Sequence, residues 1–242
     1  MDKHPTKHIK VYSIVLSIVF LILLFAFIFL FHHAGYDTKV LAKFGYMSAE
    51  VPKNYAILAW DNCLQQLGYD ADIVFLGDSI TKGCNFKKYF DKVKIVNLGY
   101  AGDTLAGITD RISMVTAVSP EKVFLMGGIN GLTDHNIDNC VELYATLLDK
   151  LNTAMPETEV FVLSVLPVSA EKEISLLCHN TSIEQFNRKI KELAIERDYT
   201  YVDLYSLYSL NGEINPALTK DGVHLCSDAY ELWANAIKPY ID

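Results

Sequence analysis

Short apolar runs recur along the chain, and longer segments with apolar positions at helical spacing separate them. The runs are rich in Val, Ile, Leu and Phe and occupy residues 72–77, 94–99, 122–128, 159–167 and 200–205. Apolar runs of this length predict strands that are covered on both faces, as in a parallel sheet. The helical pattern occupies residues 53–67, 103–118, 136–155, 182–198 and 227–240. This alternation predicts a doubly wound α/β sandwich, in which a five-stranded sheet lies between two layers of helices.

One long apolar segment precedes this pattern. Residues 11–31 contain no charged side chain, and a helix of that length spans the roughly 30 Å hydrocarbon core of a bilayer. The segment is longer than the apolar region of a cleavable signal peptide, and no small-x-small cleavage site follows it. We therefore expect a transmembrane anchor at 11–31, after a tail (1–10) and before a stalk (32–52) and a globular domain (53–242).

The charges beside the predicted anchor favour one orientation. Lys3, Lys7 and Lys10 precede the apolar segment together with the terminal amine, whereas Lys39 and Lys43 follow it. Because cytoplasmic flanks carry the excess of positive charge, we expect a cytoplasmic tail and an extracytoplasmic globular domain. The bias is small, so the opposite orientation stays open. Either orientation gives a single-pass membrane protein.

The overall charge argues against nucleic acid as a partner. The formal net charge of the chain is −8. Since the tail carries three lysines and one aspartate, the rest of the chain carries −10. An acidic domain repels phosphate backbones and anionic lipid headgroups.

The cysteines do not form a metal-binding pattern. The five positions are irregularly spaced, with no CxxC and no histidines at ligand spacing: Cys63, Cys84, Cys140, Cys178 and Cys226. This pattern gives no reason to expect a zinc site, and it favours buried free thiols over disulfides.

Polar residues gather where predicted strands end. Ser79 follows the first strand in "VFLGDSITKG", and Asp221 and His224 precede the last helix in "DGVHL". A serine hydroxyl becomes a nucleophile when an imidazole accepts its proton and a carboxylate orients that imidazole. Since ligands of doubly wound sheets bind beyond the carboxyl ends of the strands, we expect Ser79, His224 and Asp221 to form a catalytic triad there.

The same edge of the sheet offers donors for an oxyanion. The backbone N–H of Ser79 opens a predicted helix, where such groups have no intrahelical partner. Gly99 ends the second strand and can bring its N–H close to a ligand, and Asn130 follows the third strand with a side-chain amide. We therefore expect an oxyanion hole made by Ser79, Gly99 and Asn130. Asp78 is expected to support the turn by hydrogen bonds.

Four short segments together resemble a known family. They are "GDSIT", "NLGYAGDT" with Gly99, "GGIN" with Asn130, and "DGVHL" with Asp221 and His224. In this order they resemble the signature blocks of the SGNH hydrolases, also called the GDSL esterase/lipase family, over residues 60–240. The resemblance implies a flavodoxin-like sheet with strand order 2-1-3-4-5, ester hydrolysis without metal or cofactor, and the same roles for the residues above. Gly131 departs from the pattern, because many members carry Asp directly after the block Asn.

The compact chain resembles the bacterial acetylhydrolase-type members, with residues 168–181 as an expected loop. Together with the predicted anchor, this resemblance implies a membrane-anchored serine esterase. Such an enzyme would act through an acyl-enzyme on short acyl esters, such as O-acetyl groups on carbohydrate. Three alternatives stay open: a lysophospholipase, an O-acyltransferase to a cell-surface glycan, and a non-catalytic glycan-binding domain. The sequence does not indicate an oligomeric state.

Overall fold

The computed structural model describes residue 20 and residues 70–241. The predicted tail, the stalk, the helix expected at 53–67 and all of the predicted anchor except residue 20 lie outside the described residues. Among the helices that the structure describes, none combines the length and the apolarity needed to cross a bilayer. The anchor therefore stays a prediction.

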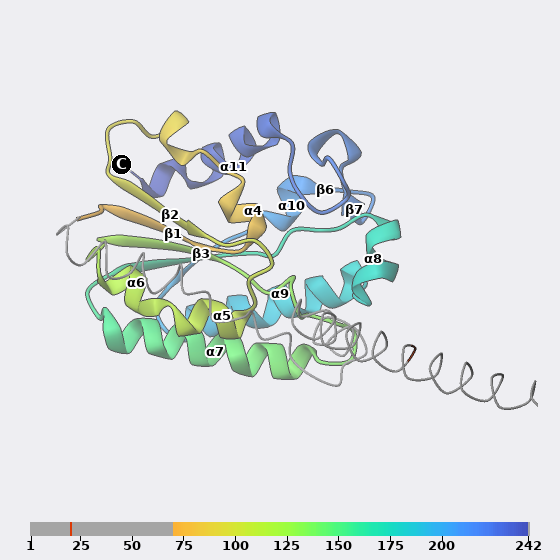
Figure 1. Cartoon of the computed structure of the whole chain (residues 1–242), viewed down its shortest axis with the longest axis horizontal. Coiled ribbons are helices and arrows are strands. Elements are labelled where there is room, and N and C mark those ends of the chain that lie inside the picture. The colour runs from red at the N-terminus through yellow and green to blue at the C-terminus, as the bar shows by residue number, and fades with distance from the viewer. Residues whose placement is uncertain (1–19, 21–69, 242) are drawn as a thin grey trace, which may run out of the picture. The chain divides into compact units, whose positions relative to one another are not determined.

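A five-stranded parallel sheet lies at the centre of the described domain, with the strand order β2-β1-β3-β4-β5 (Figure 1). The strands are β1 (Ile73–Gly77), β2 (Ile95–Gly99), β3 (Lys122–Met126), β4 (Glu159–Leu163) and β5 (Thr200–Val202). Gly77 is in register with Gly99 on one side and with Met126 on the other. The first three strands therefore end level, and the predicted fold class is confirmed.

Helices cover both faces of the sheet (Figure 1). One layer holds α5 (Leu105–Asp110), α6 (Ile112–Thr116), α7 (Ile137–Ala154) and α9 (Asn180–Ile195). The other layer holds α4 (Ser79–Lys82), α10 (Tyr205–Tyr208) and α11 (Tyr230–Ile237). The described domain also contains short 3₁₀ helices: η1 (Phe86–Lys88), η2 (Pro216–Leu218), η3 (Ser227–Ala229) and η4 (Lys238–Tyr240).

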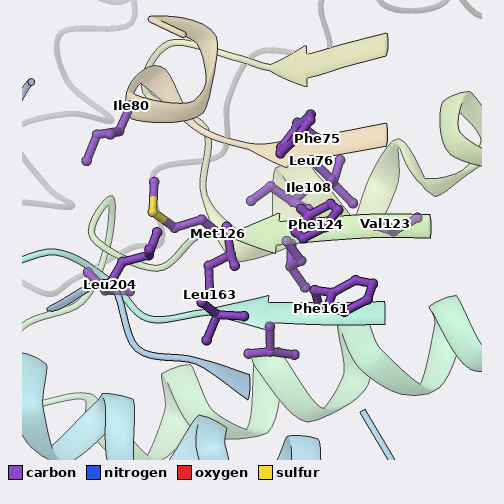
Figure 2. Close-up of a cluster of buried hydrophobic side chains, with 14 of the residues drawn as sticks. Phe75, Leu76, Ile80, Ile108, Val123, Phe124, Met126, Phe161, Leu163 and Leu204 are labelled. Atoms are coloured by element: carbon purple, nitrogen blue, oxygen red, sulfur yellow. The ribbon is translucent and has the colours of Figure 1, made fainter. Parts of the chain in front are cut away.

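A row of phenylalanine rings crosses the core of the sheet (Figure 2). Phe75, Phe124 and Phe161 are paired in register on β1, β3 and β4, and their neighbouring ring centroids lie 5.1 and 4.5 Å apart. Phe86 stacks on Phe75, and Trp233 of α11 meets Phe86 edge to face at 5.6 Å. Each such aromatic pair contributes about 1 kcal/mol beyond its buried area. The row fixes the last helix against the strand that precedes Ser79.

The structure differs from the predicted elements in two places. The single helix expected at 103–118 is broken at Arg111, whose backbone (φ −112°, ψ 23°) separates α5 from α6. The loop expected at 168–181 contains the helix α8 (Ala170–Leu176), capped by Ser169. None of the α8 residues is buried, so the sequence carries no apolar periodicity there.

Two further elements were absent from the prediction. The helix α10 begins shortly after β5, and the strands β6 (Ser209–Leu210) and β7 (Glu213–Ile214) form an antiparallel hairpin. Asn211 and Gly212 connect its strands with positive φ angles of 55° and 85°, as a tight hairpin turn requires. Ile214 donates its N–H to the Val168 carbonyl, so the hairpin packs beside the segment that follows β4.

The cysteines that the structure describes are free thiols: Cys84, Cys140, Cys178 and Cys226. Burial raises the pKa of Cys84 to about 12 and that of Cys140 to about 11. These buried groups therefore stay protonated. Cys84, Cys140 and Cys178 are buried, whereas Cys226 is only partly buried, and Cys63 lies outside the described residues.

Candidate active site

Ser79, His224 and Asp221 form a continuous chain of hydrogen bonds at the carboxyl edge of the sheet. Ser79 is the first residue of α4, directly after the turn that ends β1. Its Oγ lies 2.9 Å from Nε2 of His224. Nδ1 of the same ring lies 2.7 Å from Oδ2 of Asp221. The structure thus brings together the three residues predicted as a triad.

The loop before η3 holds the imidazole in place. The second carboxylate oxygen of Asp221 accepts the backbone N–H groups of Val223, at 3.1 Å, and of His224, at 2.7 Å. Partial burial opposes ionisation of Asp221, but these hydrogen bonds and the one from the imidazole outweigh it and lower its pKa to about 2. Thr219 donates its hydroxyl to the His224 carbonyl at 2.8 Å and accepts the Gly222 N–H at 2.9 Å. The aspartate is therefore an ionised, fixed partner for the imidazole near neutral pH.

Asp78 caps the helix that carries Ser79. Its carboxylate accepts the Ile80 N–H at 2.9 Å, and the residue is almost wholly buried. Burial raises the pKa of Asp78 to about 7, although the Ile80 hydrogen bond opposes the shift. The Ser79 N–H has no hydrogen-bond partner among the described residues. Asp78 therefore caps α4 through the Ile80 N–H and leaves the Ser79 N–H without a partner among the described residues.

Side chains from elsewhere in the chain hold the carbonyl end of α4. Tyr230 of α11 donates its hydroxyl to the Ile80 carbonyl at 2.7 Å. Asn97 of β2 donates its side-chain amide to the carbonyls of Thr81 and Cys84, at 2.9 and 3.0 Å. A helix of one turn has few internal hydrogen bonds, so these external donors fix its position.

The structure contradicts the role predicted for Gly99. Its N–H donates to Oδ1 of Asn97 at 2.9 Å, so it is not free to bind an oxyanion. A Cβ at this position would overlap the backbone nitrogen of Lys82. Gly99 is therefore a packing residue that lets β2 approach α4 closely.

Gly102, three residues further on, has the property that was expected of Gly99. It lies in the turn after β2, where Asp103 donates its N–H to the Tyr100 carbonyl at 3.3 Å. Its φ of +75° favours glycine, and its N–H has no partner among the described residues. Tyr100 donates its own N–H to the Gly77 carbonyl at 3.0 Å, which holds the turn beside the segment that leads into Ser79.

Asn130 lies at the same edge, in the turn after β3. Its side-chain nitrogen donates to the Asp103 carbonyl at 3.0 Å. An amide nitrogen has two hydrogens, so one remains for a ligand. The contact joins the third strand end to the turn that carries Gly102. The oxyanion role predicted for Asn130 stays a prediction.

Within the part of the chain that the structure describes, no group of three His, Cys, Asp or Glu side chains has the arrangement of a metal site.

The family model of the GDSL-like lipase/acylhydrolases matches residues 75–232, which include all the residues of this site. The chain belongs to the GDSL-like lipase/acylhydrolase family. The family takes its description from lipase and acylhydrolase activity, which is hydrolysis of acyl groups.

Two solved structures resemble this GDSL-family chain. A GDSL-like lipase from Bacteroides thetaiotaomicron is 23% identical with a TM-score of 0.64, over 78% of this chain and 97% of its own. An acetyl xylan esterase is 20% identical with a TM-score of 0.58, over 70% of this chain and 99% of its own. At this level of identity, the two structures establish a shared fold.

The name of one curated relative does not refer to a lipase or acylhydrolase. The N-acylneuraminate cytidylyltransferase of Streptococcus agalactiae serotype V is 23% identical over 175 residues, which are 72% of this chain and 39% of the relative. The chain thus spans about two fifths of the length of the curated relatives that it matches.

Proposed function

We propose that this GDSL-family protein is a serine esterase that hydrolyses short-chain carboxylic esters through an acyl-enzyme. The observation that carries the proposal is the unbroken hydrogen-bond chain from Ser79 through His224 to Asp221. An imidazole within hydrogen-bond reach of a serine hydroxyl, and fixed on its far side by an ionised carboxylate, is the arrangement that activates serine.

The reaction follows from this geometry. Oγ of Ser79 attacks the ester carbonyl while Nε2 of His224 accepts its proton. The tetrahedral intermediate then collapses, and the alcohol leaves with the proton from His224. Water attacks the acyl-enzyme in the second half of the reaction, with His224 again as the base. Asp221 holds Nδ1 protonated and stabilises the imidazolium.

The developing oxyanion needs donors that are in place before the reaction begins. The N–H groups of Ser79 and Gly102 have no partner among the described residues, and the Asn130 amide has a hydrogen to spare. We assign the oxyanion hole to these three groups. Gly102 thus takes the role that the sequence predicted for Gly99.

Hydrolysis is favoured over acyl transfer because the base is open to solvent. The side chains of His224 and Asp221 are 36% and 43% exposed. A transferase must keep water from the acyl-enzyme, and a base this exposed admits it. The acyltransferase alternative therefore ranks below the esterase. The hydrogen-bonded chain of Ser79, His224 and Asp221 ranks the non-catalytic glycan-binding alternative below it as well.

Carbohydrate esters are the proposed substrate class. One structural relative is named for acetyl xylan, and the curated relatives are named for an N-acylneuraminate, which is a sugar acid. Next to the His224 loop, Asn187 and Asn180 each bind both backbone groups of one residue, Val165 and Val168 respectively, at 2.8–2.9 Å. We propose that this fixed segment bounds the acyl-binding site, which would favour a short acyl group over the long chain of a lysophospholipid. The apolar segment 11–31 would place this activity at a membrane surface.

A substrate panel tests the proposal on the full-length chain in detergent. It contains p-nitrophenyl esters of increasing acyl length, acetylated xylan, an O-acetylated N-acylneuraminate and a lysophospholipid. We expect acetate release from at least one sugar ester and a rate that falls as the acyl chain lengthens. Fluorophosphonate should label the wild type but not Ser79→Ala. Ser206→Ala is the matched control, because its hydroxyl contacts a carboxylate, Asp203, at 2.6 Å, without an imidazole.

The panel can also contradict the proposal. An unlabelled wild type that releases no acyl group from any substrate would refute the esterase. A preference for the lysophospholipid would keep the mechanism and replace the substrate class.

A further inference from the structure

Arg111 occupies an unusual place for a charged residue. It lies at the break between α5 and α6, and its side chain is only 2% exposed. The guanidinium makes three hydrogen bonds: Nε donates to the Asp103 carboxylate at 2.6 Å, Nη1 to the Leu98 carbonyl at 2.7 Å and Nη2 to the Gly77 carbonyl at 2.8 Å. It also lies over the Tyr100 ring, 5.0 Å from the centroid.

The acceptors of these hydrogen bonds lie next to the proposed oxyanion donors. Gly77 precedes Ser79 by two residues at the end of β1. Leu98 and Asp103 stand on either side of the turn that carries Gly102. One buried cation therefore fixes the position of the nucleophile turn relative to the Gly102 turn.

The third donor is reached through Asp103. The backbone carbonyl of Asp103 accepts the Asn130 amide at 3.0 Å, while its carboxylate binds Arg111. All three segments that supply oxyanion donors thus meet on the Arg111–Asp103 pair. Arg111 thus joins the ends of β1 and β2 directly, and it reaches the Asn130 turn through Asp103.

Stability alone is a poor explanation for such a pair. Both side chains are almost fully buried, with 2% and 3% exposed. Removing two charges from water costs about as much as their attraction returns, and apolar residues of similar volume often serve as well. What apolar residues cannot supply is the planar fork of donors that holds several acceptors in one geometry.

On the basis of the proposed esterase function, we infer that Arg111 is a positioning residue that sets the spacing of the oxyanion donors at Ser79, Gly102 and Asn130. It acts through the backbone at Gly77 and Leu98 and through Asp103, and it does not touch the substrate. Its effect belongs to the transition state, because only there does charge develop on the oxygen that these donors bind.

Two substitutions of Arg111 test this inference in the full-length chain. Arg111→Lys keeps a cation beside Asp103, so the variant should fold, but a single ammonium cannot hold three acceptors in the same geometry. Arg111→Met removes the cation as well. Arg197→Lys is the matched control, because Arg197 also joins a carboxylate, Asp149, at 2.8 Å, to a backbone carbonyl, that of Leu193, at 3.1 Å.

Steady-state kinetics on p-nitrophenyl acetate separate positioning from folding. We expect Arg111→Lys to lower kcat by about 10²-fold with KM changed by less than about threefold. An aryl boronic acid forms a tetrahedral adduct with an active serine, so its inhibition constant should rise in proportion to the loss of kcat. Melting temperatures identify the variants that fold, and Arg197→Lys should match the wild type in every measurement.

Each other outcome decides against the inference. A folded Arg111→Lys variant with near-wild-type kcat and boronate affinity would show that the Arg111 guanidinium is not needed to position the oxyanion donors. A loss confined to KM, or failure of both Arg111 variants to fold, would make Arg111 a binding or stability residue instead. A wild type that neither hydrolyses esters nor reacts with fluorophosphonate would refute the proposed function, and this inference with it.

Discussion

Nε2 of His224 lies 2.9 Å from Oγ of Ser79, although 145 positions separate the two residues in the chain. Ser79 comes from the turn after the first strand, and His224 from the loop before the last helix. The contact exists because a doubly wound sheet brings the ends of its strands to one edge.

Substitutions of Ser79 and His224 should not have additive effects on the activation free energy. Ser79→Ala and His224→Ala should each lower kcat by about 10⁴-fold or more, since neither residue is useful without the other. The double variant should be no slower than the single ones. The measurement is kcat on p-nitrophenyl acetate, with circular dichroism as the control for folding. Losses that multiply in the double variant would mean that the two side chains act separately.

Asp221→Asn should disable the imidazole while preserving its position. An amide nitrogen facing Nδ1 favours the tautomer that carries its proton on Nε2, and that nitrogen then cannot accept the proton of Ser79. We expect kcat to fall by about 10⁴-fold with little change in melting temperature. Asp228→Asn, an exposed substitution in η3, is the control. Activity within about tenfold of the wild type would argue that Asp221 does not orient the base.

Asp78 should make the protein less stable as the pH rises towards 7. Burial raises its pKa from the ordinary 3.8 to about 7, so between these values the folded state holds a proton that the unfolded chain has released. The unfolding free energy should therefore fall by up to roughly 1.4 kcal/mol per pH unit across this interval, and the loss persists above it. Asp78→Asn cannot ionise and should remove this component.

Denaturant unfolding of the wild type and Asp78→Asn at several pH values measures the difference. The variant should gain stability over the wild type as the pH rises from 4 to 8. The exposed Asp91→Asn is the control and should follow the wild type. A constant difference between the Asp78 variant and the wild type at all pH values would rule out the raised pKa.

Gly99→Ala and Gly102→Ala should fail in different ways. A Cβ at Gly99 overlaps the Lys82 backbone, so the substitution must displace α4 and should cost about 1–3 kcal/mol of stability or more. A Cβ at Gly102 meets no atom, and only its φ of +75° is unfavourable, at about 1 kcal/mol.

The same pair separates packing from catalysis. Gly102→Ala should lower kcat by more than its small change in melting temperature explains. The positive φ is unfavourable for alanine, and a turn that relaxes to relieve it would move the unpaired amide away from the substrate oxygen. Gly99→Ala should lower the melting temperature the more strongly of the two. Thermal unfolding and kcat on the same preparations give the comparison. Full activity in Gly102→Ala would contradict the prediction, because the turn would then tolerate a Cβ at no cost to catalysis.

The sheet could be predicted because each strand is a buried apolar run that interrupts a helical pattern. Val74, Phe75 and Leu76 have no exposed surface at all, and a segment buried on both faces leaves a continuous signature in the sequence. The helix α8 leaves none, because it lies on the surface with no buried residue. Its start is set by the Ser169 cap and its packing against Gly222, where a Cβ would overlap the serine hydroxyl.

The residues of the site differ in how far the sequence could place them. Ser79, Asp221 and His224 stand in short motifs whose side chains have a chemical reason to meet, although their catalytic role stays a prediction. Gly99 ends β2 and Gly102 lies in the turn after it, and only the hydrogen bond from Gly99 to Asn97 shows which of the two amides is occupied. Arg111 gives no signal, because a lone arginine in a helical pattern is most simply interpreted as a solvent-facing residue.

The hydrogen bond from Tyr230 to the Ile80 carbonyl has a consequence for synthesis of the protein. The turn that carries Ser79 is synthesised early, whereas α11, which carries Tyr230, is synthesised only when the domain is almost complete. A nascent chain in which α11 has not yet been synthesised therefore carries Ser79 on a helix that lacks the hydrogen bond from Tyr230. Hydrolysis should begin only after translation of the whole domain, so a chain that ends prematurely should accumulate without esterase activity.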